Sequence, residues 1–310
     1  MIHVLSLNPC TDKTAALDRF EIDSANRIRV IREDAGGKGM NVSRMCANLS
    51  APVLLTGFSF EKTPGVLEKA LEEGHVPYRL LSCPGALRVN LKILDRSRND
   101  TIEINEESAP VTDSKLAEME ETLLSSLQSG DFLVLTGSLP KGAPVTLYRT
   151  LTEKAHEKGC FVALDCDGDA LKEALKASPD LIKPNRQELR RLFAEDPETA
   201  KDALPLIRRL IGETGVRYVC HSRGAEGAML VSESECFFSP PMDVPVRGVY
   251  GAGDAMLSGV CVALHRGDSL SNALRLGAAS SHATIQLPGT HMGDMDETLR
   301  LYALAKATPM

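Results

Sequence analysis

The stretch from Arg247 to Gly259, RGVYGAGDAMLSG, places Gly251, Ala252 and Gly253 directly before an acidic residue and an apolar segment. Glycines can adopt a positive φ and let a ligand approach the backbone. The helix expected after them would point its free N–H groups and the positive end of its dipole at an anion. Asp254 is unexpected there because its carboxylate repels an anion, and ordinary helix capping explains it equally well.

A second glycine-rich loop, Gly36-Gly37-Lys38-Gly39, precedes a helix expected to run through Leu49. It lacks the spacing of a Walker A loop. A cation among glycines at a helix start nevertheless suits an anionic group. The alternative is a tight turn with a solvated lysine.

A third segment, Lys183-Pro184-Asn185-x-x-Glu188, follows an apolar strand and opens a helix. Asn185 and Glu188 carry the oxygen ligands that Mg²⁺ prefers, usually through retained water molecules. Capping of the helix is the alternative, because Pro184 suits the first turn and Glu188 suits the dipole.

Strands and helices alternate over most of the chain, which predicts a mostly parallel sheet with helices on both faces. Ligands of such sheets bind where the strands end. Polar or glycine-rich loops follow six expected strands, and we therefore expect an active site at this edge. These loops contain Asn8 and Asp12, Gly36–Asn41, Thr136–Pro140, Lys183–Glu188, Ser222–Gly224 and Gly251–Asp254. Two segments with period-two patterning, Cys10–Asp34 and Arg88–Asn105, interrupt the series and are predicted to form a small separate sheet.

Composition narrows the class of protein. The 310 residues are 43% hydrophobic and 25% charged, typical of a globular protein, and the net charge of −7 does not favour nucleic acid as a partner. We expect no membrane span, since no apolar run approaches about 20 residues. The eight cysteines are scattered, which favours reduced thiols in the cytoplasm over a disulfide framework. The seven histidines show no metal-ligand spacing.

Five motifs in order resemble the phosphofructokinase B (PfkB) branch of the ribokinase-like sugar kinases, and the resemblance covers nearly the whole chain. They are GGKGMNVSR (Gly36–Arg44), TGSLPKG (Thr136–Gly142), KPNRQEL (Lys183–Leu189), SRGAEGA (Ser222–Ala228) and YGAGDAMLSG (Tyr250–Gly259). The resemblance implies a three-layer α/β/α sandwich with a mostly parallel central sheet and a small β-sheet lid. We expect the core to comprise residues 1–9, 35–86 and 107–310, and the lid residues 10–34 and 87–106.

The resemblance also implies roles for individual residues. Asp254 would take the proton from the substrate hydroxyl as it attacks the γ-phosphoryl group of ATP, and Gly251, Ala252 and Gly253 would form an anion hole. Residues implied to bind the nucleotide are Lys183, Asn185, Glu188, Ser222, Gly224, Gly251 and Gly253, with Asn185 and Glu188 holding Mg²⁺ through water. Residues implied to hold the sugar are Asp12, Gly37, Lys38, Asn41 and Ser138.

Two further stretches bear on the substrate. Asn8–Asp12 resembles the NPxxD start of kinases that act on phosphorylated hexoses, and Arg88-Val89-Asn90-Leu91-Lys92 resembles the RxNxK lid strand of 1-phosphofructokinases. Cations at Lys38, Arg88 and Lys92, and at Arg27, suit a substrate that already bears a phosphate. A solvated strand face is the alternative for Arg88 and Lys92. The expected reaction converts fructose 1-phosphate to fructose 1,6-bisphosphate, with tagatose 6-phosphate as the alternative substrate.

Apolar side chains in the lid, including Ile28, Val30 and Ile31, predict a homodimer joined through the lids. The chain departs from the family pattern at His221, Arg223 and Tyr250, all on the nucleotide side.

Two other classes of protein are less consistent with the sequence. A dinucleotide-dependent dehydrogenase needs a GxGxxG fingerprint after an early strand, and none follows Leu7 or Phe58. A non-catalytic sugar-phosphate sensor on the same fold would not need to retain Asp254 and the three residues before it.

Overall fold

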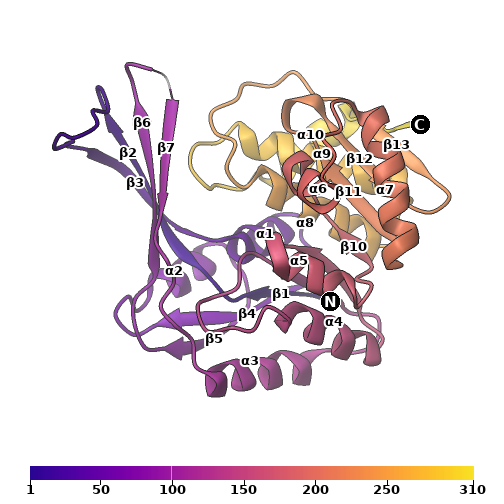
Figure 1. The fold of residues 1–310 in the computed structure, drawn as a ribbon, viewed down its shortest axis with the longest axis horizontal. Coiled ribbons are helices and arrows are strands. Elements are labelled where there is room, and N and C mark those ends of the chain that lie inside the picture. Colours follow the sequence, from indigo (N-terminus) through magenta and orange to yellow (C-terminus); the bar gives the residue numbers. More distant parts are fainter. Residues whose placement is uncertain (99) are drawn as a thin grey trace.

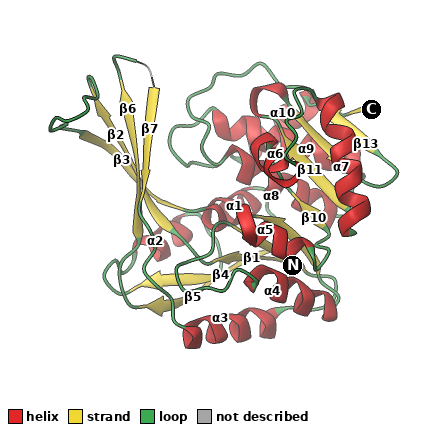
Figure 2. Ribbon diagram, in the orientation of Figure 1, coloured by secondary structure: helices red, strands yellow, loops and turns green. Residues whose placement is uncertain are grey.

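The computed structural model describes residues 1–98 and 100–310. A large sheet lies between layers of helices, and a smaller sheet projects from one side of this core (Figures 1 and 2). This is the α/β/α sandwich with a β-sheet lid that the sequence predicted.

The central strands of the large sheet run parallel, in the order β5-β4-β1-β8-β9-β10-β11, and β12, β13 and β14 continue it in antiparallel pairing. Strand β1 reads IHVLS and is buried at every position, because helices cover both faces of a parallel sheet. The strands are β1 (Ile2–Ser6), β4 (Val53–Phe60), β5 (Tyr78–Cys83), β8 (Phe132–Thr136), β9 (Phe161–Asp165), β10 (Leu181–Ile182), β11 (Tyr218–Ser222), β12 (Ala228–Val231), β13 (Cys236–Ser239) and β14 (Thr308–Pro309).

Helices form two layers around one main apolar core. One layer contains α1 (Lys38–Asn48), α8 (Ala252–His265), α9 (Leu270–Ile285) and α10 (Met295–Leu304). The other contains α3 (Asp113–Ser126), α4 (Leu147–Glu157), α5 (Gly168–Leu175), α6 (Arg186–Phe193) and α7 (Ala200–Thr214). Helix α2 (Val66–Glu73) contacts the base of the small sheet. Within the described residues, no helix is long and apolar enough to span a membrane.

The small sheet, called the lid from here on, has the strand order β3-β2-β6-β7. Its strands are β2 (Cys10–Leu17), β3 (Arg29–Gly36), β6 (Arg88–Asp95) and β7 (Asp100–Asn105). The two alternating segments of the sequence each form an antiparallel pair, and together they make the small separate sheet that their patterning predicts. A parallel pairing of β2 with β6 joins the two pairs into one sheet.

The order in which successive strands are added to the sheet reverses between β1 and β8, although all of these strands run parallel. From β1 the chain continues to β4 and β5 on one side, whereas β8, β9, β10 and β11 extend the sheet on the other. Such a reversal leaves a crevice at the carboxyl ends of the two strands, where ligands of doubly wound sheets bind. The structure bridges this crevice with a 2.9 Å hydrogen bond from Asn8 Nδ2 to Ser138 Oγ.

Candidate active site

Asp254 lies in the first turn of α8, directly above the strand ends. Gly251 is the N-terminal cap of this helix with a φ of 76°, a conformation that disfavours any residue with a Cβ. The N–H groups of the first turn have no partner within the helix and remain available to an anion. The 3.4 Å bond from the Ala252 N–H to Val249 O is long and therefore weak.

The Asp254 side chain is buried, with only 7% of the residue exposed, and accepts a 2.8 Å hydrogen bond from Asn41 Nδ2. Burial raises the pKa of Asp254 to about 6, although the charges of Lys38 and Lys183 and the bond from Asn41 oppose the shift. A carboxylate with a pKa close to neutral is suited to accept a proton from a hydroxyl group. Capping does not explain this residue, because Gly251 occupies the cap position and no side-chain cap bond forms.

Two lysines lie next to a second carboxylate, that of Asp165, beside the start of α8. Lys38 Nζ is 3.1 Å from Asp165 Oδ1, and Lys183 Nζ is 3.2 Å from Asp165 Oδ2. Burial alone would raise the pKa of Asp165, but Lys183 and Lys38 hold it below its usual value. A Cβ added to Gly253 would lie 3.2 Å from Lys183 Nζ, so this ammonium group sits against the first turn of α8.

Asp165 is the site residue that the sequence interpretation missed. It is the last residue of β9, and its position at the end of an apolar strand was the one signal that pointed to it. Asp165 therefore aligns the ammonium groups of Lys38 and Lys183 beside the start of α8.

The glycines at 36, 37 and 39 are required by close approaches of the backbone. A Cβ on Gly36 would lie 2.0 Å from Asp12 Oδ2, and a Cβ on Gly39 would lie 2.7 Å from Ser6 Cβ. Gly37 caps α1 with a φ of 108°. This loop therefore brings α1, with Lys38 and Asn41, against the ends of β1 and β2.

Arg88 connects the lid to Asn8, in the loop that follows β1, where the strand order of the large sheet reverses. Its guanidinium group donates to Asn8 Oδ1 at 3.0 Å, to Asn8 O at 3.2 Å and to Asn90 Oδ1 at 2.6 Å. Asn8 in turn donates to Ser138. Arg88 is thus half-buried and oriented, and a freely solvated strand face is not what the structure shows.

Asp12 and Lys92 are buried charged residues on the neighbouring lid strands β2 and β6. Asn90 Nδ2 donates to Asp12 Oδ1 at 3.2 Å, and Lys92 Nζ lies 3.3 Å from the same oxygen. Lys92 Nζ also lies 3.7 Å from the centre of the Tyr250 ring. By contrast, Arg27 is exposed in the segment between β2 and β3, where the lid projects away from the core (Figure 1).

Asn185 and Glu188 cap α6 reciprocally. Asn185 Oδ1 accepts from the Glu188 N–H at 2.9 Å, and Glu188 Oε2 accepts from the Asn185 N–H at 2.8 Å. The interpretation that Asn185 and Glu188 cap the helix is therefore correct for these two oxygens. Pro184, however, precedes the cap and does not lie in the first turn that the sequence had suggested. Burial, and then the neighbouring Asp165 carboxylate, raise the pKa of Glu188.

The same two residues are compatible with a divalent cation. Oε1 of Glu188 takes no part in the capping box, and a positive ion would relieve the repulsion between the half-buried Glu188 carboxylate and the buried Asp165 carboxylate. No cluster of three acidic, histidine or cysteine ligands occurs in residues 1–98 and 100–310, so the donor set suits an ion that retains most of its water.

Ser222 and Gly224 lie beside this helix start. The Ser222 N–H donates to Pro184 O at 3.2 Å, and Gly224 begins a short 3₁₀ turn with a φ of 56°. His221 and Arg223, which depart from the family pattern, are buried structural residues. His221 Nδ1 bonds to Pro184 O at 3.0 Å, and Arg223 Nη1 lies 3.4 Å from Pro197 O.

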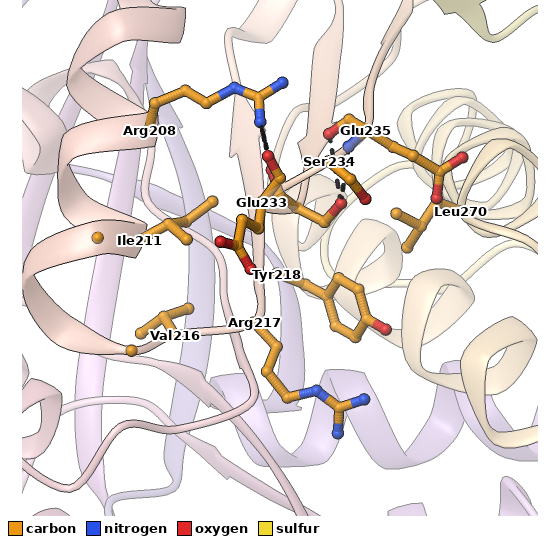
Figure 3. Close-up of a pocket in the computed structure, with 12 residues that line it drawn as sticks. Arg208, Ile211, Val216, Arg217, Tyr218, Glu233, Ser234, Glu235 and Leu270 are labelled. Carbon is orange, nitrogen blue, oxygen red and sulfur yellow. Dashed lines mark hydrogen bonds between the residues drawn. The ribbon is translucent and has the colours of Figure 1, made fainter.

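A pocket of about 670 Å³ lies away from these residues (Figure 3). Arg208, Tyr218 and Glu233 are among the residues that line it. It is located where β11 begins and where β12 turns into β13, which is the opposite edge of the sheet from Asp254. None of the site residues predicted from the sequence lines it.

The strand order, the lid and the glycine-led helix carrying Asp254 define a ribokinase-like kinase. The family model described as pfkB family carbohydrate kinase matches residues 5–297, and the chain belongs to this family.

Curated relatives and solved structures agree with this assignment. The chain is 33% identical to a 1-phosphofructokinase of Rhodobacter capsulatus, over 98% of this chain and 96% of the relative. It is 30% identical to a 1-phosphofructokinase of Bacillus subtilis, over 92% of each chain. It is also similar to the crystal structure of phosphofructokinase-2 from Escherichia coli in complex with substrates and products, with a TM-score of 0.91, 26% identity and 98% of both chains covered.

Proposed function

We propose that the protein transfers the γ-phosphoryl group of ATP to the free 6-hydroxyl of fructose 1-phosphate, which yields fructose 1,6-bisphosphate. The observation that carries the proposal is Asp254, a buried carboxylate with a pKa of about 6 at the glycine-led start of a helix. The names of the curated relatives support the choice of fructose 1-phosphate.

In the proposed reaction, Asp254 accepts the proton of the 6-hydroxyl as this oxygen attacks the γ-phosphorus. Asn41 holds the carboxylate in place from α1. The N–H groups of Gly251, Ala252 and Gly253 face the charge that develops on the transferred group, and Lys38 and Lys183 stand beside them. Phosphoryl transfer depends mostly on such positioning and electrostatic stabilisation.

Asn185 and Glu188 would hold Mg²⁺ through water molecules on the nucleotide side. Bound there, the ion would neutralise part of the negative charge of the ATP phosphates. Ser222 and Gly224 would border the nucleotide there. On the other side of Asp254, Asp12 and Asn90 would bind sugar hydroxyls, and Arg88 would bind the phosphate already present.

We also propose a homodimer joined through the lids. Ile22, in the segment between β2 and β3, is 81% exposed, and Ile31 of β3 is 53% exposed. Val30, Leu94 and Ile104 are also exposed on the lid strands. So many apolar side chains in one projecting sheet are costly to leave in water. Sedimentation at increasing concentration tests this proposal, and a monomer throughout would refute it.

All eight cysteines are unpaired and buried, which is consistent with a reducing compartment such as the cytoplasm.

The activity is tested by coupled ADP release with MgATP. The panel comprises fructose 1-phosphate, fructose 6-phosphate, tagatose 6-phosphate, fructose and ribose. We expect the largest kcat/KM with fructose 1-phosphate. A preference for tagatose 6-phosphate would retain the chemistry and change the substrate, whereas turnover of unphosphorylated sugars alone would refute the role given to Arg88.

A further inference from the structure

Lys92 is a charged residue that the lid buries. It lies on β6 and is 7% exposed. An ammonium group has three donors and is strongly hydrated in water, so its burial requires replacement partners. The structure supplies two of them, the Asp12 carboxylate at 3.3 Å and the face of the Tyr250 ring at 3.7 Å. The charge of Lys92 is therefore engaged within the protein and is not free for a substrate phosphate.

The three residues come from different parts of the fold. Asp12 and Lys92 lie on the paired lid strands β2 and β6, where Asp12 is opposite Asn90 and Thr14 is opposite Lys92. Tyr250 belongs to the core and directly precedes Gly251, the cap of α8. The Lys92–Tyr250 contact is thus a link between the lid and the loop that presents Asp254.

Tyr250 also lies close to β7, the lid strand that pairs with β6. Its burial raises its pKa, and the Glu103 carboxylate of β7 raises it further. The phenol therefore stays neutral, and its ring keeps the electron-rich face that attracts a cation. The sequence departs from the family pattern at Tyr250, which we expected on the nucleotide side. The contact with Lys92 shows instead that its ring lies against the lid, and it gives a physical reason for an aromatic residue here.

We infer that Tyr250 is a positioning residue of the sugar-phosphate site. Its ring holds the Lys92 ammonium group against Asp12. In this way Tyr250 couples the position of the lid to the orientation of the Asp12 carboxylate. Asp12 has four hydrogen-bonding positions on its two oxygens. Lys92 and Asn90 both contact Oδ1, while Oδ2 lies against Gly36, where an added Cβ would be 2.0 Å away. These contacts fix the plane of the carboxylate, and with it the direction in which the remaining lone pairs can meet a sugar hydroxyl. This inference rests on the proposed function of the same site.

The first test is a comparison of Michaelis constants. In Tyr250→Leu we expect the KM for fructose 1-phosphate to rise by about 3- to 30-fold, as expected for loss of a cation–π contact. The KM for ATP should remain within about twofold of wild type, since Lys92 and Asp12 lie on the sugar side. Tyr250→Phe keeps the ring and should keep a KM within about twofold of wild type.

Tyr302→Leu is a matched control. Tyr302 receives Arg275 at 4.4 Å from its ring centre and lies in α10, away from the lid. The same substitution at a similar contact should leave both Michaelis constants unchanged. An equal KM for fructose 1-phosphate in Tyr250→Leu and Tyr302→Leu overturns the inference.

A double-mutant cycle identifies the residue through which Tyr250 acts. In a Lys92→Met background, Tyr250→Leu should have no further effect on the KM for fructose 1-phosphate, because the ring has lost its partner. Fully additive effects of the two substitutions would overturn the inference.

A binding measurement separates this inference from the proposed function. The chain contains no tryptophan, so Tyr250→Trp introduces a single tryptophan, whose fluorescence can be excited selectively over that of the remaining tyrosines and whose ring retains the attraction for Lys92. We expect its emission to change on titration with fructose 1-phosphate without ATP, and to lose this response when Lys92→Met is added. A response that persists without Lys92 overturns the inference. Failure of the wild type to turn over any sugar in the panel would instead refute the proposed function.

Discussion

Asn41 Nδ2 donates a 2.8 Å hydrogen bond to Asp254 Oδ2, although the two residues are 213 positions apart in the chain. The bond joins the first turns of α1 and α8, the two helices that begin with glycine loops at the same edge of the sheet. It stabilises the ionised form of a carboxylate that burial would otherwise keep protonated. Asn41 therefore both holds the Asp254 carboxylate in position and lowers its pKa.

The first prediction concerns Asp254 itself. We expect Asp254→Asn to lower kcat by about 10²- to 10⁴-fold, because the amide cannot accept the hydroxyl proton. The KM values should change little, since the side chain keeps its shape and burial. Asp268→Asn, at an exposed position just beyond the same helix, is the control. Turnover within a few-fold of wild type would show that Asp254 is not the base.

The second prediction is a pH dependence. The base must be deprotonated, so kcat/KM should fall as the pH decreases through about 6, by about tenfold per unit below it. A sugar phosphate also ionises near pH 6, which we take as about the second pKa of a phosphate monoester. Asn41→Ala separates the two groups, because it removes a bond that lowers the pKa of Asp254 and leaves the substrate unchanged. The midpoint should move to higher pH in this variant; an unmoved midpoint would assign the profile to the substrate.

The third prediction concerns the carboxylate between the two lysines. Asp165→Asn leaves the charge of Lys183 buried without its partner, and the free energy of unfolding should fall by about 3 kcal/mol or more. Activity should also fall, because Lys38 and Lys183 lose the group that aligns them. Denaturant unfolding and kinetics are compared with Asp169→Asn, which removes an exposed pair with Lys172 and should have a small effect. Equal stability of the two variants would contradict the role of Asp165.

The fourth prediction concerns acid stability. Burial, opposed by the bond to Pro184 O, lowers the pKa of His221 to about 4, from 6.5 in the unfolded chain. The unfolded state therefore takes up this proton first as the pH decreases, and stability is lost between about pH 6.5 and 4. The loss from pH 7 to pH 5 should be about 2 kcal/mol.

His221→Gln should remove this part of the pH dependence. Comparing the two proteins isolates His221 from Asp254, whose raised pKa acts in the opposite direction. His75→Gln, at an exposed position, is the control. An unchanged pH dependence in His221→Gln would contradict the assignment.

The fifth prediction concerns Arg88. In Arg88→Met, the KM for fructose 1-phosphate should rise by about 10- to 100-fold, the usual cost of losing a charged hydrogen-bonding partner. The KM for fructose, if it is turned over, should change much less. Arg149→Met removes a partly exposed arginine of α4 and serves as the control. A similar rise for phosphorylated and unphosphorylated sugars would mean that Arg88 only supports Asn8 and Asn90.

Local pattern was sufficient to identify the elements that carry the site. Apolar strands such as Ile2–Ser6 and Phe132–Thr136 are buried on both faces, and an uninterrupted apolar run reflects that burial directly. The glycines before Asp254 and Lys38 mark conformations and close approaches that a Cβ would prevent. Because ligands of a doubly wound sheet bind where its strands end, the sequence also indicated which loops would meet.

The partners of the side chains were decided by the tertiary structure alone. Alternation in Arg88–Asn105 shows that side chains face opposite sides of a strand, but not that Lys92 faces Asp12 and Tyr250. Nor does the end of an apolar strand reveal that Asp165 binds two lysines. These contacts join residues far apart in the chain, and they exist only because the lid, the sheet and α8 pack together in one arrangement. Composition and period describe each segment separately, whereas charge pairing and pKa values depend on which segments become neighbours.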